Sequence, residues 1–209
     1  MGIQRSGQSR NVPLLLLLTV VIFLFFRYTG TTTTGISDHQ VAVEMPESGN
    51  NVIPKLQVSV RQVSSSPPKL GIAVTNAHAG PVTVLTWDSP LDPLALQLGL
   101  LSFVPAGGDD GSPIEIPTVQ VRRRMPPGAD SLATIGAGQT REQELELREP
   151  IVPLGRLRGT VVSVVCRGEW TSVWPSEADA ISKESLANAG AGEDAFRGSF
   201  QSEAVDIEI

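Results

Sequence analysis

The chain has few of the side chains on which enzyme chemistry usually depends. Its 209 residues include one cysteine, Cys166, and two histidines, His39 and His78. A single cysteine excludes an internal disulfide and a cysteine-based zinc cluster, and two histidines leave little for metal or proton chemistry. No Asn-x-Ser/Thr sequence occurs, which excludes N-linked glycosylation. We therefore predict no cofactor and no metal site.

Basic residues are scarce beyond the first part of the chain. Three of the sixteen Lys and Arg residues and none of the twenty-two Asp and Glu residues lie in residues 1–35. The other residues therefore carry thirteen basic against twenty-two acidic side chains. Nucleic-acid binding needs a basic face that neutralises phosphates, so we expect no nucleic-acid partner.

One long apolar run lies near the N-terminus, over residues 12–26. Two arginines precede it and one follows it, a bias that keeps residues 1–11 in the cytosol and sends the later chain across the membrane. No Ala-x-Ala-like cleavage site follows the run. We predict a transmembrane signal anchor over residues 12–28. A cleaved signal peptide is the alternative, because the run spans only about 22 Å as a helix, less than the roughly 30 Å hydrocarbon core.

The anchor predicts a single-pass membrane protein with a cytosolic N-terminus and a lumenal or extracellular domain. Cleavage would make the protein secreted. Residues 29–53 are rich in threonine, glycine and polar side chains, with no periodic apolar face to bury. We expect them to form a flexible tether.

From residue 54 the sequence is typical of short strands. Apolar and polar residues alternate with a period of two, or β-branched residues cluster, over residues 56–61, 70–76, 82–87, 100–104, 114–121, 140–147 and 160–166. We expect 70–76 and 82–87 to pair as a hairpin and 160–166 to lie mid-sheet. Pro117 shifts the buried parity within 114–121, which indicates an edge strand or a bulge there. Seven or eight short strands, without an amphipathic helix of ten residues, predict an all-β, antiparallel, immunoglobulin-like β-sandwich over residues 54–175.

The last part of the chain, residues 176–209, is polar and acidic. We expect a weak helix around residues 178–187 and a final strand over residues 205–209, where apolar and acidic residues alternate. The acids should form a solubilising surface.

Residues 70–92 read LGIAVTNAHAGPVTVLTWDSPLD, and this run resembles the N-terminal prodomain of the deuterolysin family of fungal zinc metalloproteases. The order of the features that follow is also similar: Arg122-Arg123-Arg124, Ser131-Leu132, Ala137-Gly138-Gln139 and Glu144-Leu145-Glu146-Leu147. The resemblance covers residues 55–175, implies a β-sandwich of fungal secretory origin, and extends to fungal membrane or secreted proteins that carry this module alone. The chain has no His-Glu-x-x-His motif, so peptidase activity is not implied.

The residues that could be catalytic have simpler interpretations. His78 falls in a turn and His39 in the tether, so we expect His78 to be an ordinary solvated turn residue. No Gly-x-Ser-x-Gly sequence supports a Ser-His-Asp triad. Asp109 and Asp110 are neighbours in a glycine-rich loop. We expect them to be turn residues rather than the acid pair of a glycosidase. We predict no catalytic residues and no enzyme activity.

Two groups of residues are candidate interaction surfaces. Arg122, Arg123 and Arg124 could dock an acidic partner or a lipid head group, or be cut by a dibasic-processing protease. In the simpler interpretation, alternate arginines point to solvent while one covers apolar surface. Trp170 and Trp174 could be an exposed aromatic anchor for a partner. We favour a position in the core for both, because they share the strand parity of Cys166. We expect Cys166 to be an inert buried thiol.

Three functions are consistent with these features. The first is a non-enzymatic, membrane-tethered or secreted β-sandwich that contacts an unknown protein or glycan partner. The second is a prodomain-like inhibitor or folding helper of a separate metalloprotease. The third is a hydrolase with an unrecognised acid pair.

Overall fold

The structure is a computed structural model that describes residues 51–106 and 111–209. The predicted signal anchor, nearly all of the tether, and Asp109 with Asp110 lie outside the described residues. Within the described ranges, no helix has both the length and the apolar character needed to cross a bilayer.

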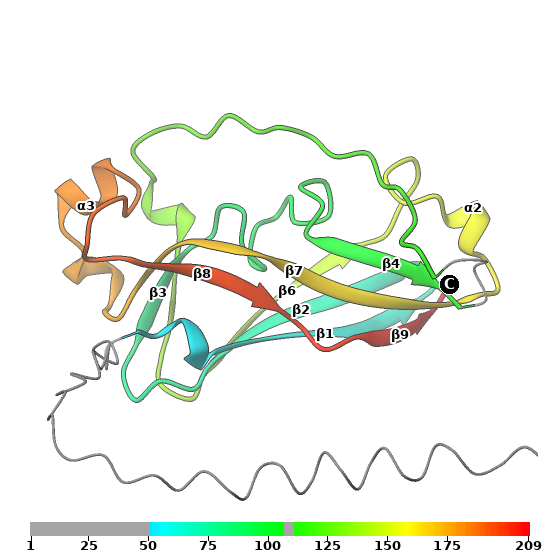
Figure 1. Ribbon diagram of the computed structural model, residues 1–209, viewed down its shortest axis with the longest axis horizontal. Helices are drawn as coiled ribbons and strands as arrows, with labels where there is room; N and C mark the ends of the chain where they lie inside the picture. Colours follow the sequence, from blue (N-terminus) through cyan, green and yellow to red (C-terminus); the bar gives the residue numbers. More distant parts are fainter. Residues whose placement is uncertain (1–50, 107–110) are drawn as a thin grey trace, which may run out of the picture. The chain divides into compact units, whose positions relative to one another are not determined.

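Strands dominate the described chain (Figure 1). They are β1 (Leu56–Ser65), β2 (Pro68–Asn76), β3 (Val82–Leu85), β4 (Leu101–Pro105), β5 (Leu132–Ile135), β6 (Thr140–Glu146), β7 (Val161–Trp174), β8 (Phe196–Gln201) and β9 (Val205–Glu208). Short helical turns connect them: η1 (Ile53–Lys55), η2 (Ala129–Ser131), α2 (Leu154–Leu157), η3 (Ala178–Ala180) and α3 (Lys183–Ala187).

The first sheet has three antiparallel strands in the order β1-β2-β6. Alternation along β2 directs its apolar residues Leu70, Ile72 and Val74 into the interior, where all three are fully buried. Gly71 lies between them, and a Cβ atom there would come within 2.3 Å of a Glu142 carboxylate oxygen. The glycine therefore leaves room for the ion pair of Arg61 and Glu142, 2.6 Å apart.

The second sheet is built around β7, which has neighbours on both edges. Its first half pairs with β4 and β9, and its second half pairs with β3 and β8, while β5 continues the sheet beyond β3. The predicted mid-sheet strand over residues 160–166 is confirmed. It continues to Trp174 because the chain stays apolar on its inner face.

The two sheets overlap in Figure 1, with β1, β2 and β6 behind β4 and β7. The core lies between them, since Leu70 and Ile72 of one sheet and Phe103, Val162 and Val164 of the other belong to one buried cluster. This confirms an all-β antiparallel sandwich.

The predicted hairpin between residues 70–76 and 82–87 is wrong. β2 pairs with β1 and β6, whereas β3 pairs with β5 and β7, so the intervening loop crosses from one sheet to the other. The buried Asn76 side chain explains the crossing: its amide nitrogen donates to the carbonyls of Gly80 at 2.9 Å and Ile135 at 2.8 Å. These bonds hold the loop against the second sheet.

The extended segment predicted over residues 114–121 does not join a sheet as a strand. We call residues 111–128 the strap. Its backbone contacts with the sandwich are Ile114 N–H to the Phe103 carbonyl, 2.8 Å, and Val119 N–H to the Gln97 carbonyl, 3.0 Å. Prolines at 113 and 117 remove the N–H groups that a continuous ladder would need.

The acidic residues 176–209 pack on the sandwich. β8 and β9 line one edge of β7, and Phe200 and Ile207 enter the core. The expected final strand is confirmed as β9, and the expected helix is reduced to η3 and the five-residue α3, whose N-cap Ser182 accepts the Ser185 N–H at 3.0 Å.

A register shift in β7 changes the predicted parity of the two tryptophans. The irregularity falls between Trp170 and Val173, where β7 pairs with β8. Trp170 therefore joins the main core, while Trp174 joins a second cluster with Leu85 and Ile181. The Trp174 indole N–H donates to the Ser185 hydroxyl at 2.9 Å, which ties α3 to the sheet.

Candidate functional site

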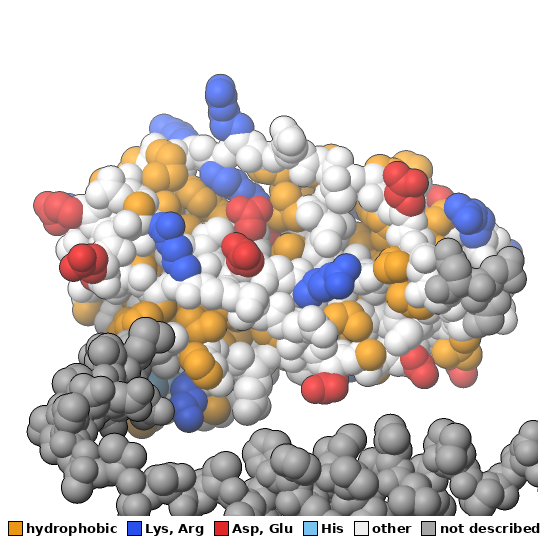
Figure 2. All heavy atoms as spheres, viewed as in Figure 1, with side chains coloured by type: hydrophobic (Ala, Val, Ile, Leu, Met, Phe, Trp, Pro, Cys, Tyr) orange, Lys and Arg blue, Asp and Glu red, His pale blue; other side chains and the backbone are white. Residues whose placement is uncertain are grey.

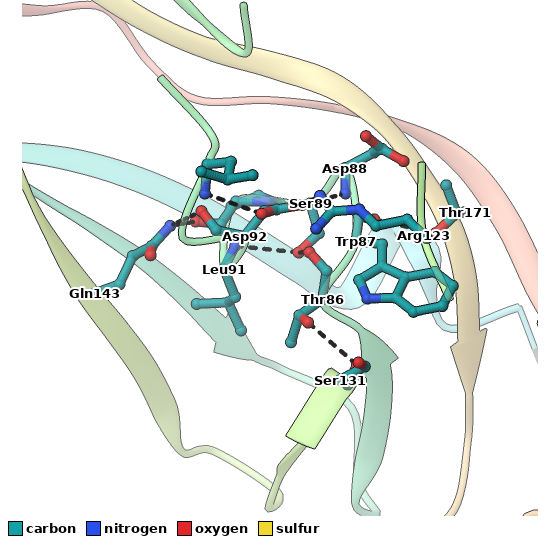
Figure 3. A network of polar contacts seen from close by, with 12 residues as sticks. Thr86, Trp87, Asp88, Ser89, Leu91, Asp92, Arg123, Ser131, Gln143 and Thr171 are labelled. Atoms are coloured by element: carbon teal, nitrogen blue, oxygen red, sulfur yellow. Dashed lines mark hydrogen bonds and ion pairs between the residues drawn. The ribbon is translucent and has the colours of Figure 1, made fainter. Parts of the chain in front are cut away.

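The loop after β3 contains a buried acid, Asp92, whose side chain is 1% exposed. One carboxylate oxygen accepts the Asp88 N–H at 2.8 Å and the other accepts the Leu94 N–H at 2.9 Å. The same carboxylate forms an ion pair with Arg123 of the strap (Figure 3). Three donors therefore satisfy a charge that would be very costly to bury alone.

Further hydrogen bonds fix the backbone of this loop. The Gln143 side chain on β6 donates to the carbonyls of Pro90 at 2.6 Å and Asp92 at 2.9 Å. The Ser89 hydroxyl donates to the Thr86 carbonyl at 2.7 Å and accepts the Leu91 N–H at 3.1 Å (Figure 3). The network therefore sets the position of the preceding residue pair, Trp87 and Asp88.

Arg123 links the strap to this loop in two ways. Besides its ion pair with Asp92, its guanidinium carbon lies 5.9 Å from the centroid of the Trp87 ring, within the range of a cation–π contact. The Trp87 carbonyl accepts the Thr171 hydroxyl at 3.2 Å, which connects the loop to β7. Trp87 is thus held between the strap and the second sheet.

Two open hollows lie beside Trp87 and Met125, which line both of them. The first, of about 430 Å³, is also lined by Asp88, Glu169, Asn188 and Arg197. The second, of about 670 Å³, is also lined by Val121, Arg122, Arg124 and Asp130. Each hollow therefore combines an aromatic and a thioether side chain with charged groups.

The strap carries most of the exposed large apolar side chains found in the described residues. Val119, Val121 and Met125 are 48%, 37% and 50% exposed. Arg122 and Arg124 are also exposed, and no acid occurs from residue 116 to residue 129. In Figure 2, basic side chains project along the upper edge of the molecule, where the strap runs in Figure 1.

The three arginines differ in their surroundings. Arg122 and Arg124 face solvent, while Arg123 points inward to Asp92 and Trp87. Arg123 is therefore neutralised by Asp92, whereas Arg122 and Arg124 form no ion pair with another residue that the structure describes.

Trp170 and Trp174 are buried, with 1% and 2% of their surface exposed. The exposed-anchor alternative therefore does not describe them, because the sheet and the residues after β7 cover both rings. Among the described residues, the buried aromatic pair Trp170 and Phe200 has ring centroids 4.9 Å apart. Trp87, which the sequence analysis did not single out, lines both hollows, whereas the buried Trp170 lines only the first.

Cys166 is fully buried between the sheets, and this burial raises the pKa of its thiol to about 12. A thiol with so high a pKa carries almost no thiolate at neutral pH, which agrees with the inert thiol expected from the sequence. His78 lies in the turn after β2, where its Nδ1 accepts the Gly80 N–H at 3.2 Å. Within residues 51–106 and 111–209, no group of three His, Cys, Asp or Glu side chains is placed to hold a metal ion.

A family model for the immunoglobulin-like domain matches residues 55–209. The chain belongs to the immunoglobulin-like domain family. An "Uncharacterized secreted protein" of Arthroderma benhamiae (strain ATCC MYA-4681 / CBS 112371) is 31% identical to it over 160 residues, which cover 74% of this chain and 78% of the relative.

The match extends this immunoglobulin-like domain to residue 209, in agreement with the packing of β8 and β9 on β7. The similarity to a fungal protein is in line with the expected fungal relationship. Neither comparison points to the deuterolysin prodomain, so that more specific resemblance has no support from them.

Proposed function

We propose that this immunoglobulin-like domain is a non-enzymatic interaction module that binds a partner through the strap and the adjacent Trp87 loop. The supporting observation is that the exposed apolar side chains Val119, Val121 and Met125 lie on the same segment as Arg122 and Arg124, for which the described residues supply no ion-pair partner. Aromatic residues, Met and Arg are the side chains enriched at protein interfaces. Exposed apolar patches on a soluble protein often mark interaction sites.

The buried acid that supports this surface, Asp92, is not placed to act on a substrate. Asp92 is closed off from the hollows by its three donors, Asp88 N–H, Leu94 N–H and Arg123. A general acid or base must instead reach a substrate proton. The network therefore acts as a support that positions the binding face.

We place the domain outside the cytosol, either secreted or tethered by the predicted anchor. The secreted relative supports the secreted form. Sequencing the N-terminus of the mature protein from its own host, together with membrane fractionation, tests this. A soluble chain that begins near Thr32 would establish secretion and overturn the tethered form.

A prodomain-like inhibitor or folding helper is the second candidate. It rests on the sequence resemblance of residues 70–92 alone, a run that contains Trp87 and Asp92 of the site. Addition of the full chain to a purified deuterolysin-type protease tests it. A concentration-dependent loss of peptidase activity would support this candidate, and unchanged activity would exclude it for that protease.

Site-specific photo-crosslinking tests the binding face. We would replace Met125 with benzoylphenylalanine in the full chain, in its host, and use the same replacement at exposed Glu144 of β6 as the matched control. We expect a discrete protein adduct at position 125 and none at 144. Equal adducts at both positions, or none at 125, would contradict the proposed face. Turnover in a broad hydrolase screen, abolished by a single acid substitution, would favour the hydrolase instead.

A further inference from the structure

The strap has an unusual backbone for a segment that lies along a β-sandwich. From residue 111 to residue 124 it runs without a turn or bend, so its course is extended. Residues 120–125 make no backbone-to-backbone hydrogen bond with any other described residue. All of residues 117–126 except Arg123 are exposed. Residues 120–125 therefore present a line of N–H and C=O groups that no other backbone group of the described chain pairs, as an edge strand does.

The strap is also anchored at two points. The Val119 N–H, just before this line, donates to the Gln97 carbonyl at 3.0 Å, and Arg123, within the line, is fixed by Asp92 and Trp87. A segment anchored in this way loses little conformational entropy when a ligand pairs with it. The structure is thus suited to accept another strand.

The side chains along the strap define what that strand would contain. Arg122 and Arg124 are two residues apart and exposed, so in an extended chain they share one side. Val121 and Met125 occupy the alternate positions and are 37% and 50% exposed. Opposite charges and apolar side chains stabilise a strand pair when they face each other across it. The complementary strand has acids at every second position and apolar residues between them.

We infer that the strap binds an extended acidic peptide segment of the partner, which adds as a strand along residues 119–125 and places its carboxylates on Arg122 and Arg124. This rests on the proposed function, since it specifies what the binding face recognises. A sulfated glycan would also meet the arginines. However, it offers no backbone for the unpaired amides and no apolar groups for Val121 and Met125.

The test uses a fluorescein-labelled octapeptide of alternating glutamate and valine, whose binding to the full chain is followed by fluorescence anisotropy. One matched peptide carries glutamine in place of glutamate. Another is N-methylated at alternate residues, which keeps the charges but prevents backbone pairing. We expect both changes to weaken binding at least tenfold, and the affinity of the parent peptide to fall as salt rises.

The protein variants are R122E/R124E and, as a matched control, R156E/R158E. Arg156 and Arg158 are exposed arginines with the same spacing, in and just after α2. We expect the first pair to weaken peptide binding at least tenfold and the second to change it less than twofold. Both pairs are on the surface, so circular dichroism should show an unchanged fold.

Several results would overturn the inference. They are no binding of the parent peptide, equal binding of the N-methylated peptide, and equal effects of the two variants. Binding of a heparin-derived oligosaccharide that R122E/R124E abolishes, without peptide binding, would assign the site to a polyanionic glycan. If the crosslink at position 125 forms while the peptide fails, the peptide inference is wrong and the proposed function stands. If both fail, both are wrong.

Discussion

Asp92 is a charged residue in an almost fully buried position, and its hydrogen-bond partners determine the free-energy cost of burying its charge. We predict that Asp92→Asn lowers the free energy of unfolding by about 3 kcal/mol, because Arg123 keeps its charge without a partner and the new amide cannot accept both backbone N–H groups. Urea unfolding measures this. Glu142→Gln is the control: its pair with Arg61 is exposed and should contribute less than about 1 kcal/mol. Equal losses would contradict a supporting role for Asp92.

Cys166 gives a prediction with a pH dependence. Burial raises the pKa of its thiol from 9.0 to about 12, so between these values the unfolded chain releases a proton that the folded chain keeps. Below pH 9 the Cys166 thiol therefore makes its full contribution to the free energy of unfolding. Above pH 9 this contribution decreases, by at most about 1.4 kcal/mol per pH unit. The Cys166→Ala variant should lack this part of the alkaline decline.

Thiol labelling gives a second measurement on Cys166. Iodoacetamide at pH 8 should leave the native chain unmodified and label one thiol per chain in urea, because the buried thiol is both protonated and covered. Stoichiometric labelling of the native chain would contradict the buried position.

Among the elements, β1 and β9 are joined by a side chain. The Gln62 amide nitrogen donates to the Glu208 carbonyl at 2.6 Å, and the Gln62 side-chain oxygen accepts the Glu208 N–H at 3.0 Å. The amide thus links an edge of the first sheet to an edge of the second. We predict that Gln62→Leu lowers the free energy of unfolding by about 1–2 kcal/mol and speeds hydrogen exchange at the Glu208 N–H. Gln57→Leu, at an exposed position of the same strand, is the control and should leave that exchange rate unchanged.

Strands with strict alternation could be predicted from sequence because one face of each is buried. This holds for β1, β2, β6 and β9. β8 was missed because Gly198 interrupts its apolar residues; a Cβ atom there would come within 3.0 Å of Ile53, a residue far away in the sequence. β5, Leu132–Ile135, was also missed. Its buried face carries only Ala133 and Ile135, and a small residue beside one large one gives little alternation in hydropathy.

The site was predictable only in part, for a similar reason. The arginine cluster stands out in an acidic chain, and one inward arginine follows from alternation. Its partner Asp92 is thirty-one residues away, and nothing local to either residue specifies the pair. An acid within the proline-rich run Ser89-Pro90-Leu91-Asp92-Pro93 could have indicated a buried carboxylate that needs a distant cation.

The whole described domain should unfold as one unit, since β8 and β9 share the core with both sheets. We predict that Ile207→Ala lowers the free energy of unfolding by about 2–4 kcal/mol, because it leaves a cavity at a fully buried position of β9. Tryptophan fluorescence, which reports on buried Trp170, and far-ultraviolet circular dichroism should give the same shifted urea midpoint. The control Val161→Ala removes an exposed side chain and should have little effect. Separate midpoints in Ile207→Ala would show that β9 unfolds independently.

The position of β8 and β9 also determines the timing of folding. Both strands follow every other strand of the described chain, yet they pair with β7 along one whole edge of the second sheet. During synthesis, that edge of β7 stays open until residues 196–208 have emerged. The second sheet is therefore completed only after the last two strands have been synthesised.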